Sequence, residues 1–105
     1  MTWKATSETD EDLIAGRDFI AVDSERAALA FLDTAFETFD RLAQFPETGP
    51  KANFKQRSLK EVRFCVMPPP FNRWLIFYKP TTDGVEIKRV LYGSINWRQE
   101  PERFF

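Results

Sequence analysis

Apolar residues recur at steps of three and four positions between Ala28 and Ala43, and this period constrains the fold more than any other feature of the sequence. The recurring residues are Ala28, Phe31, Leu32, Ala35, Phe36, Phe39, Leu42 and Ala43. Such spacing places them on one side of an α-helix. Asp23-Ser24 can cap its start, and Phe45-Pro46 marks its end because proline lacks a backbone donor. The chain must therefore bury one side of a long helix against another layer.

A shorter helix is predicted before the long one, beginning at Thr9 and ending near Ala21. Thr9 and Asp12 have the spacing of a capping box, in which each side chain satisfies a backbone donor. The acidic residues around position 10 suit the positive end of the helix dipole. A tight turn joins the two helices, so we expect an antiparallel helical hairpin. Trp3 to Thr6 is predicted to form a short strand before it.

Beyond position 58 the apolar period changes to two, which is typical of strands. Strands are expected at Leu59 to Val66, Arg73 to Tyr78 and Val85 to Tyr92. The middle strand is apolar on both faces, which favours a central position. Prolines at 68–70 exclude a tight hairpin between the first two strands, whereas Thr82-Asp83-Gly84 is a turn before the third.

The predicted order is β-α-α-β-β-β, an α+β fold with a helical hairpin packed on a small twisted antiparallel sheet. The segment from Pro46 to Ser58 lacks apolar periodicity and contains Gly49-Pro50, so it is predicted to be a loop. Gly93 ends the sheet, and a short C-terminal helix or tail follows around Trp97. With no repeat and no linker, residues 1–105 are expected to form a single domain.

The sequence contains no histidine and a single cysteine, Cys65. These counts exclude Ser-His and Cys-His nucleophile pairs, an internal disulfide and a zinc site built on several thiolates. We therefore expect no metal and no cofactor. No apolar run is long enough to span a bilayer, and no apolar stretch follows a basic start. A cytoplasmic protein without a membrane partner is the resulting expectation.

Charge is balanced overall but unevenly distributed. The chain has 15 basic and 16 acidic residues, a net charge of −1, whereas proteins that hold phosphate backbones non-specifically are usually strongly basic. Positions 7–12 are acidic, and the stretch from Lys51 to Arg63 is basic. Lys55, Arg57 and Lys60 are candidate phosphate contacts, with a purely solvating role as the alternative.

Two arginines occupy strand positions that share a face with apolar residues. Under strict alternation Arg89 shares a face with Val85, Ile87 and Leu91. Arg63 shares one with Leu59 and Cys65, although Glu61 lies there too. A guanidinium on an apolar face requires a partner. One interpretation is a structural bridge to Glu61, Glu86 or an acidic residue of the first helix. The other is a basic patch, formed by both arginines on the open face of the sheet, that meets a target.

Six segments, in this order and at this spacing, resemble the RelE/ParE toxin superfamily over roughly residues 8–98. They are Asp12-Leu13, Ala27 to Phe31, Leu42 to Gly49, Leu59 to Arg63, Pro70 to Tyr78 and Arg89 to Gly93. The resemblance implies the toxin of a type II toxin–antitoxin pair, neutralised by a cognate antitoxin in a hetero-oligomer. In such pairs a disordered antitoxin tail folds onto the sheet and the helical hairpin of the toxin.

The superfamily has two branches that the sequence can be compared with. Members like RelE are ribosome-dependent messenger-RNA endonucleases with an arginine at the start of the central strand. Leu75 stands at that position here, and a leucine cannot stabilise a developing phosphate charge. Members like ParE act on DNA gyrase, and Arg89 to Gly93 resembles their last strand, with Tyr92 in place of a histidine. Leu75, Tyr92 and the charge balance favour the ParE-like branch.

The candidate site residues follow from this choice. In the ParE-like interpretation the target or the antitoxin is contacted by Arg63, Arg89, Tyr92, Trp97 and Arg98. In the nuclease alternative Arg63, Arg89 and Tyr92 would be catalytic, with Tyr92 as general acid. A structural alternative makes Tyr92 a strand-end aromatic and packs Trp97 on the sheet. A third possibility for the whole chain is a degenerate toxin fold that binds a partner and does no harm.

Overall fold

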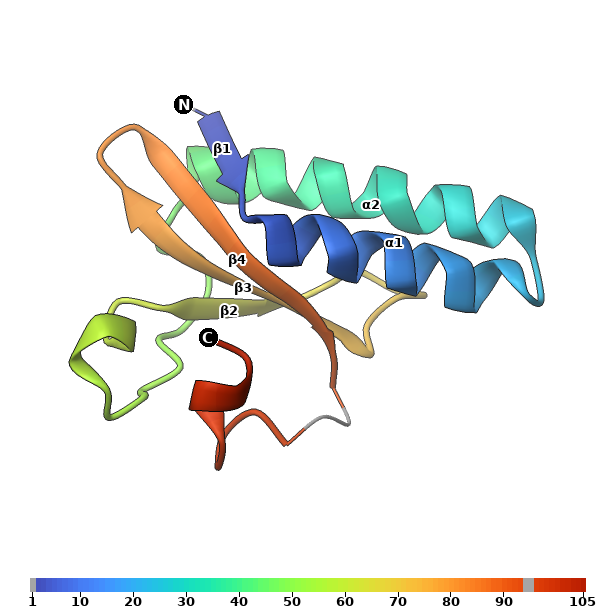
Figure 1. The fold of residues 1–105 in the computed structure, drawn as a ribbon. Helices are drawn as coiled ribbons and strands as arrows, with labels where there is room; N and C mark the ends of the chain where they lie inside the picture. Colours follow the sequence, from blue (N-terminus) through green and yellow to red (C-terminus); the bar gives the residue numbers. More distant parts are fainter. Residues whose placement is uncertain (1, 94–95) are drawn as a thin grey trace.

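The computed structural model describes residues 2–93 and 96–105 and places a helical hairpin on one face of a four-stranded sheet (Figure 1). The α+β class and the order β-α-α-β-β-β are confirmed. The elements are β1 (Thr2–Ala5), α1 (Ser7–Ala21), α2 (Glu25–Gln44), η1 (Arg57–Leu59), β2 (Arg63–Val66), β3 (Trp74–Thr81), β4 (Gly84–Tyr92) and η2 (Pro101–Arg103). In the described part of the chain, no helix has the length and hydropathy needed to cross a bilayer.

Both helices begin at a capped residue, but the first cap lies earlier than predicted. Thr6, rather than Thr9, caps α1, because its Oγ1 accepts from the Thr9 N–H at 3.1 Å. Thr9 is buried inside the first turn and donates to the Ile87 carbonyl at 3.0 Å. Ser24 caps α2 as predicted, by accepting from the Ala27 N–H at 3.1 Å. The predicted capping box of Thr9 and Asp12 is therefore wrong, and Asp12 makes other contacts.

The sheet has the order β1-β4-β3-β2 and is mixed. β2, β3 and β4 pair antiparallel, as expected, whereas β1 pairs parallel to β4 from Thr2↔Gly84 to Ala5↔Ile87. The antiparallel prediction thus holds for three strands only. Parallel neighbours require a long crossover connection, and the helical hairpin is part of the one that links β1 to β4.

A β-bulge in β4 changes which residues share a face. Phe77 is opposite Arg89 and Tyr78 is opposite Ile87, so Lys88 has no cross-strand partner. A bulge inverts the alternation of the residues that follow it. Arg89 therefore lies on the face of Phe77 and Leu91, and the prediction that it shares a face with Ile87 is wrong.

Each face of the sheet carries its own hydrophobic core. The helices cover the first face, where the buried side chains include Phe31, Phe39, Leu42, Ile76, Tyr78 and Ile87. The second face is covered by the segment 52–62 and by the C-terminal tail, with Ala52, Phe54, Leu59, Val62, Phe77, Leu91 and Trp97 buried there. That face is not open, contrary to the sequence-based expectation. Because Leu59 lies in η1 and Val62 precedes the strand, β2 begins only at Arg63.

Candidate functional site

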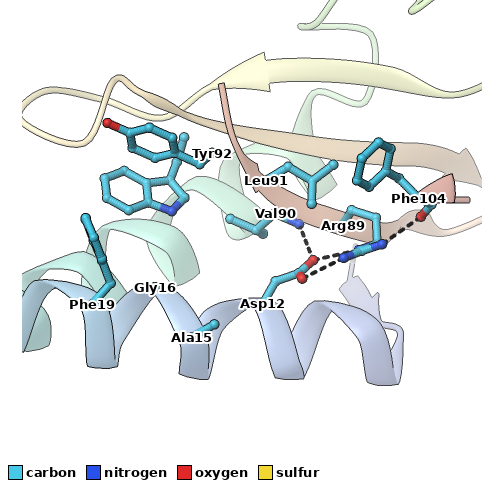
Figure 2. Close-up of a pocket in the computed structure, with 10 residues that line it drawn as sticks. Asp12, Ala15, Gly16, Phe19, Arg89, Val90, Leu91, Tyr92 and Phe104 are labelled. Atoms are coloured by element: carbon cyan, nitrogen blue, oxygen red, sulfur yellow. Dashed lines mark hydrogen bonds and ion pairs between the residues drawn. The ribbon is translucent and has the colours of Figure 1, made fainter. Parts of the chain in front are cut away.

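Arg89 joins α1, β4 and the C-terminal tail. Its Nε and Nη2 donate to the two carboxylate oxygens of Asp12, each at 2.8 Å (Figure 2). Its Nη1 donates to the Phe104 carbonyl at 2.9 Å. The hydrogen bonds to Asp12 raise the pKa of Arg89, although partial burial opposes them. The guanidinium is therefore charged, and each of its three nitrogens donates to a partner within the protein. This is the structural interpretation that the sequence left open.

The position of Asp12 follows from how α1 takes over from β1 along the edge of β4. β1 ends at Ala5, which pairs with Ile87. One and two turns into α1, Thr9 donates to the Ile87 carbonyl and Asp12 accepts from the Val90 N–H at 3.0 Å. Helix side chains thus satisfy backbone groups that a longer β1 would have paired with. This arrangement holds the Asp12 carboxylate at the distance that Arg89 requires.

An apolar groove of about 440 Å³ lies between α1 and the end of β4, next to the ion pair (Figure 2). Its aromatic lining consists of Phe19, Trp74 and Tyr92, and Phe104 closes the tail side. The ring of Phe19 is 6.4 Å from each of Trp74 and Tyr92, yet this residue remains 67% exposed. A groove with aromatic walls and one internally neutralised ion pair suits an apolar side chain of a protein partner.

Arg63 lies on the other face of the sheet and holds a loop. Its Nη1 donates to the Gly49 carbonyl, 2.6 Å away. Arg63 is the cross-strand partner of Tyr78, whereas Arg89 is the partner of Phe77. Directly opposite residues in a sheet point to the same face, and neighbours along a strand point to opposite faces. The prediction that the two arginines form one basic patch is therefore wrong.

Tyr78 holds the same loop as Arg63, and we call these two residues the loop anchor. Its hydroxyl donates to the Pro46 carbonyl and accepts from the Gly49 N–H, both at 2.8 Å. Burial raises the pKa of Tyr78, while the hydrogen bond from Gly49 and the charge of Arg63 oppose the shift. The phenol is therefore protonated at neutral pH and is a structural group.

Replacing Tyr78 with phenylalanine is expected to lower the free energy of unfolding by about 1–3 kcal/mol, because two backbone groups lose their partner. Urea denaturation monitored by circular dichroism measures this loss. Tyr92→Phe is the matched control, since no hydrogen bond of the Tyr92 hydroxyl is present among the described residues, and it should change stability by less than about 0.5 kcal/mol. Equal losses for the two variants would contradict the loop-anchor role.

Trp97 belongs to the second core. It is 6% exposed, and its ring lies 4.9 Å from Phe77, 5.4 Å from Phe64 and 6.0 Å from Phe54. Arg98 is exposed, and its guanidinium carbon lies 4.5 Å from the centre of the Trp97 ring. Trp97 therefore fastens the tail to the sheet, as the structural alternative held, and Arg98 is the member of this pair that a partner can reach.

The candidate phosphate contacts lie on the segment that covers the second face. Lys55, Arg57 and Lys60 are all exposed, and none forms an ion pair within residues 2–93 and 96–105. Lys55 and Arg98 line a common hollow of about 390 Å³ that also contains Glu102. Of the predicted contacts, the structure thus brings Lys55 and Arg98 together, in a hollow that neither Arg89 nor Tyr92 lines.

Leu75 and Cys65 offer no charged or activated side chain. Leu75 pairs with Leu91 and Val66 and packs against the second core. Burial raises the pKa of the Cys65 thiol more than nearby Arg41 lowers it, so the thiol is not activated as a nucleophile. Among the described residues there is no group of three or more potential metal-ligating side chains.

Sequence reasoning missed Asp12 and the aromatic groove. Asp12 was assigned to a cap, and its true partner, Arg89, is 77 positions away. The sequence does contain one signal for this contact. An arginine among apolar strand residues requires a carboxylate partner, and the acidic residues of the first helix are among the candidates. Phe19 and Trp74 gave no such signal, because single aromatic residues are common in any core.

Comparison with known proteins was made on both the sequence and the fold. The family model of the ParE toxin of the parDE type II toxin–antitoxin system matches residues 4–97. Nine chains of solved structures are similar, among them a chain of the chromosomal ParDE TA system from P. aeruginosa. That chain has a TM-score of 0.68 and 18% sequence identity, over 88% of this chain and 95% of its own. No curated protein sequence matches.

Proposed function

This chain belongs to the ParE toxin family and is the toxin component of a type II toxin–antitoxin system, and we propose that it inhibits DNA gyrase by binding to it. In this proposal the toxin forms no covalent intermediate and transfers no phosphoryl group. A cognate antitoxin neutralises it by forming a hetero-oligomer. Gyrase works in the bacterial cytoplasm, so that is where the toxin would act.

The engagement of Arg89 is the observation that carries this proposal. Phosphodiester cleavage requires cationic donors aimed at the charge that develops in the transition state. The three donating nitrogens of Arg89 are occupied by Asp12 and Phe104, and Leu75 supplies no charge. Arg63, the other proposed catalytic arginine, lies on the opposite face of the sheet. These contacts support a toxin that acts through its surface.

The test combines two assays on the purified full-length toxin. Supercoiling of relaxed plasmid by gyrase and ATP should be inhibited, and messenger RNA on translating ribosomes should remain intact. Adding the antitoxin encoded beside the toxin gene should restore supercoiling. Cleaved messenger RNA with unchanged supercoiling would establish the nuclease alternative instead. Inactivity in both assays would identify the chain as a degenerate toxin fold.

A further inference from the structure

The charge of this protein is divided between the two sides of its sheet. Residues 7–47, which contain α1 and α2, hold eleven Asp and Glu and three Arg, a net charge of −8, whereas the remaining residues carry +7. The helices cover the first face of the sheet, and the segment 52–62 and the C-terminal tail cover the second. In Figure 1, η1 (yellow-green) and the tail (red) lie on the side of the sheet away from the helices. The near-neutral total therefore combines an acidic layer of helices with a basic remainder.

The segment that covers the second face presents its cations to solvent. Phe54 and Leu59 are buried in the second core and fix the segment, while Lys55, Arg57 and Lys60 are exposed. The Lys60 N–H donates to the Arg57 carbonyl at 3.4 Å, and side chains three positions apart in a 3-10 helix lie one above the other. Arg57 and Lys60 therefore project on the same side. Among the described residues, none of the three cations forms an ion pair.

The C-terminal tail adds Arg98 to these cations. Arg98 and Lys55 line the hollow of about 390 Å³, in which Glu102 is the one carboxylate. The guanidinium carbon of Arg98 lies 4.5 Å from the centre of the Trp97 ring and 5.7 Å from that of the Phe64 ring. A guanidinium that is already held against two rings loses less freedom when it binds an anion. Arg98 is thus an exposed cation that is held in place.

The sheet itself adds lysines to the second face. Lys4 and Lys79 are the cross-strand partners of Glu86, and the Lys88 Nζ lies 3.0 Å from the Glu86 carboxylate. Both strand neighbours of Glu86 are buried in the first core. Because neighbours along a strand point to opposite faces, the row of Lys4, Glu86 and Lys79 points to the second face. Three lysines thus share one glutamate there.

The second face lacks the side chains that read or stack bases. Within residues 51–62 and 96–105 no aromatic side chain is exposed, since Phe54 and Trp97 are buried and Phe104 and Phe105 are half-buried. Proteins that hold single-stranded nucleic acid stack its bases on accessible aromatic rings. The helices α1 and α2, which could enter the major groove of a duplex, lie on the other side of the sheet. The face therefore suits the phosphate backbone of a duplex.

We propose that the second face binds the phosphate backbone of the double-stranded DNA on which gyrase acts. This inference rests on the proposed function, since gyrase supplies the DNA. Each uncompensated cation that meets a phosphate releases a condensed counterion, and this release favours binding. The acidic helices are repelled by DNA and turn away from it, so the protein approaches with its basic side first. A chain with a net charge of −1 can thus bind DNA through one face.

Fluorescence anisotropy of a labelled DNA duplex with the full-length toxin tests this chemistry. A duplex of about 20 base pairs is longer than the 40 Å length of the protein. At about 50 mM salt the unmodified toxin should bind it, and the affinity should fall as salt rises. The second-face triple variant, Lys55→Gln with Arg57→Gln and Lys60→Gln, should bind at least about tenfold more weakly. Its plot of log affinity against log salt should be less steep by about 2–3.

The matched control removes the same charge from the other side of the sheet. Arg17→Gln, Arg26→Gln and Arg41→Gln together replace the three arginines of the helices, and binding should stay within about threefold because salt screens distant charges. If the second-face triple variant fails to fold, Lys60→Gln alone changes one exposed side chain and should lower the salt slope by about 1. No binding by the unmodified toxin, equal losses in the two triple variants, or tighter binding of single-stranded DNA or of an RNA duplex would overturn the inference.

The two triple variants are then compared in the supercoiling assay with gyrase. The second-face triple variant should require at least about threefold more toxin for half-inhibition, and the control triple variant should not. If the second-face triple variant inhibits as well as the unmodified toxin, this face does not contact the DNA of gyrase, and gyrase inhibition still stands. Absence of inhibition by the unmodified toxin contradicts the proposed function. The anisotropy measurement contains no gyrase and tests the face separately, so the two failures can be told apart.

Discussion

Replacing Arg89 with alanine is expected to lower the free energy of unfolding by about 3–5 kcal/mol, because it leaves a buried carboxylate without its charged partner. The Asp12 side chain is only 13% exposed and would retain the Val90 N–H alone. The Phe104 carbonyl would lose its donor as well, which loosens the tail. For a domain of this size the melting temperature should fall by roughly 15 °C. Thermal unfolding followed by circular dichroism measures the fall.

Arg17→Ala is the matched control for this variant. Arg17 also pairs with a neighbouring aspartate, but the side chains of Arg17 and Asp18 are 43% and 64% exposed, so its loss should cost less than about 1 kcal/mol. A double-mutant cycle with Asp12→Ala isolates the coupling within the buried pair. An Arg89→Ala protein with unchanged stability and lost toxicity would contradict the structural role and make Arg89 a direct contact with the target.

Replacing Trp97 with alanine is expected to cost a similar amount, about 3–5 kcal/mol, because it removes the largest side chain that fastens the tail to the second core. The ring packs between Phe54, Phe64 and Phe77. The tail cannot refill the volume that the indole ring leaves, since Phe105 already packs on Phe54 and Phe77. Urea denaturation should show a lower midpoint for the variant.

Arg98→Ala is the control, because it removes only the cation stacked on the same ring from an exposed position. Its cost should be about 0.5–1 kcal/mol. If Trp97→Ala abolishes toxicity while the denaturation midpoint is retained, Trp97 is a target contact and the second core does not depend on it. If Arg98→Ala abolishes toxicity at full stability, Arg98 is the contact.

The helical hairpin could be predicted because local signals agreed over most of its length. Ser24 is a good cap, Pro46 stops the chain, and the apolar period between them is regular. The central position of β3 depends on less local information but could still be predicted, since a strand as apolar as residues 74–78 must lie inside a sheet. The error at the first cap arose because Thr6 and Thr9 are both suitable caps, and the contact of Thr9 with Ile87 decides between them.

The second core and the bulge could not be predicted, for physical reasons. Ala52, Phe54 and Leu59 have no regular spacing, since irregular backbone can turn apolar side chains inward without a period. Lys88 is an ordinary strand residue, and nothing in its type indicates a bulge. One bulge was enough to place Arg89 on a different face from the one expected. The sequence indicates that Arg89 requires a partner, but which carboxylate pairs with it depends on tertiary structure.

We propose that this toxin acts by binding and does not turn over. The most direct measurement follows supercoiling over time at a fixed gyrase concentration, while the toxin is varied from below to above one molecule per gyrase. A binding inhibitor should reduce the rate in proportion to the gyrase it occupies, and the remaining activity should stay constant with time. Complete and progressive loss of gyrase activity at a toxin concentration far below that of gyrase, or progressive cleavage of ribosome-bound messenger RNA, would contradict it.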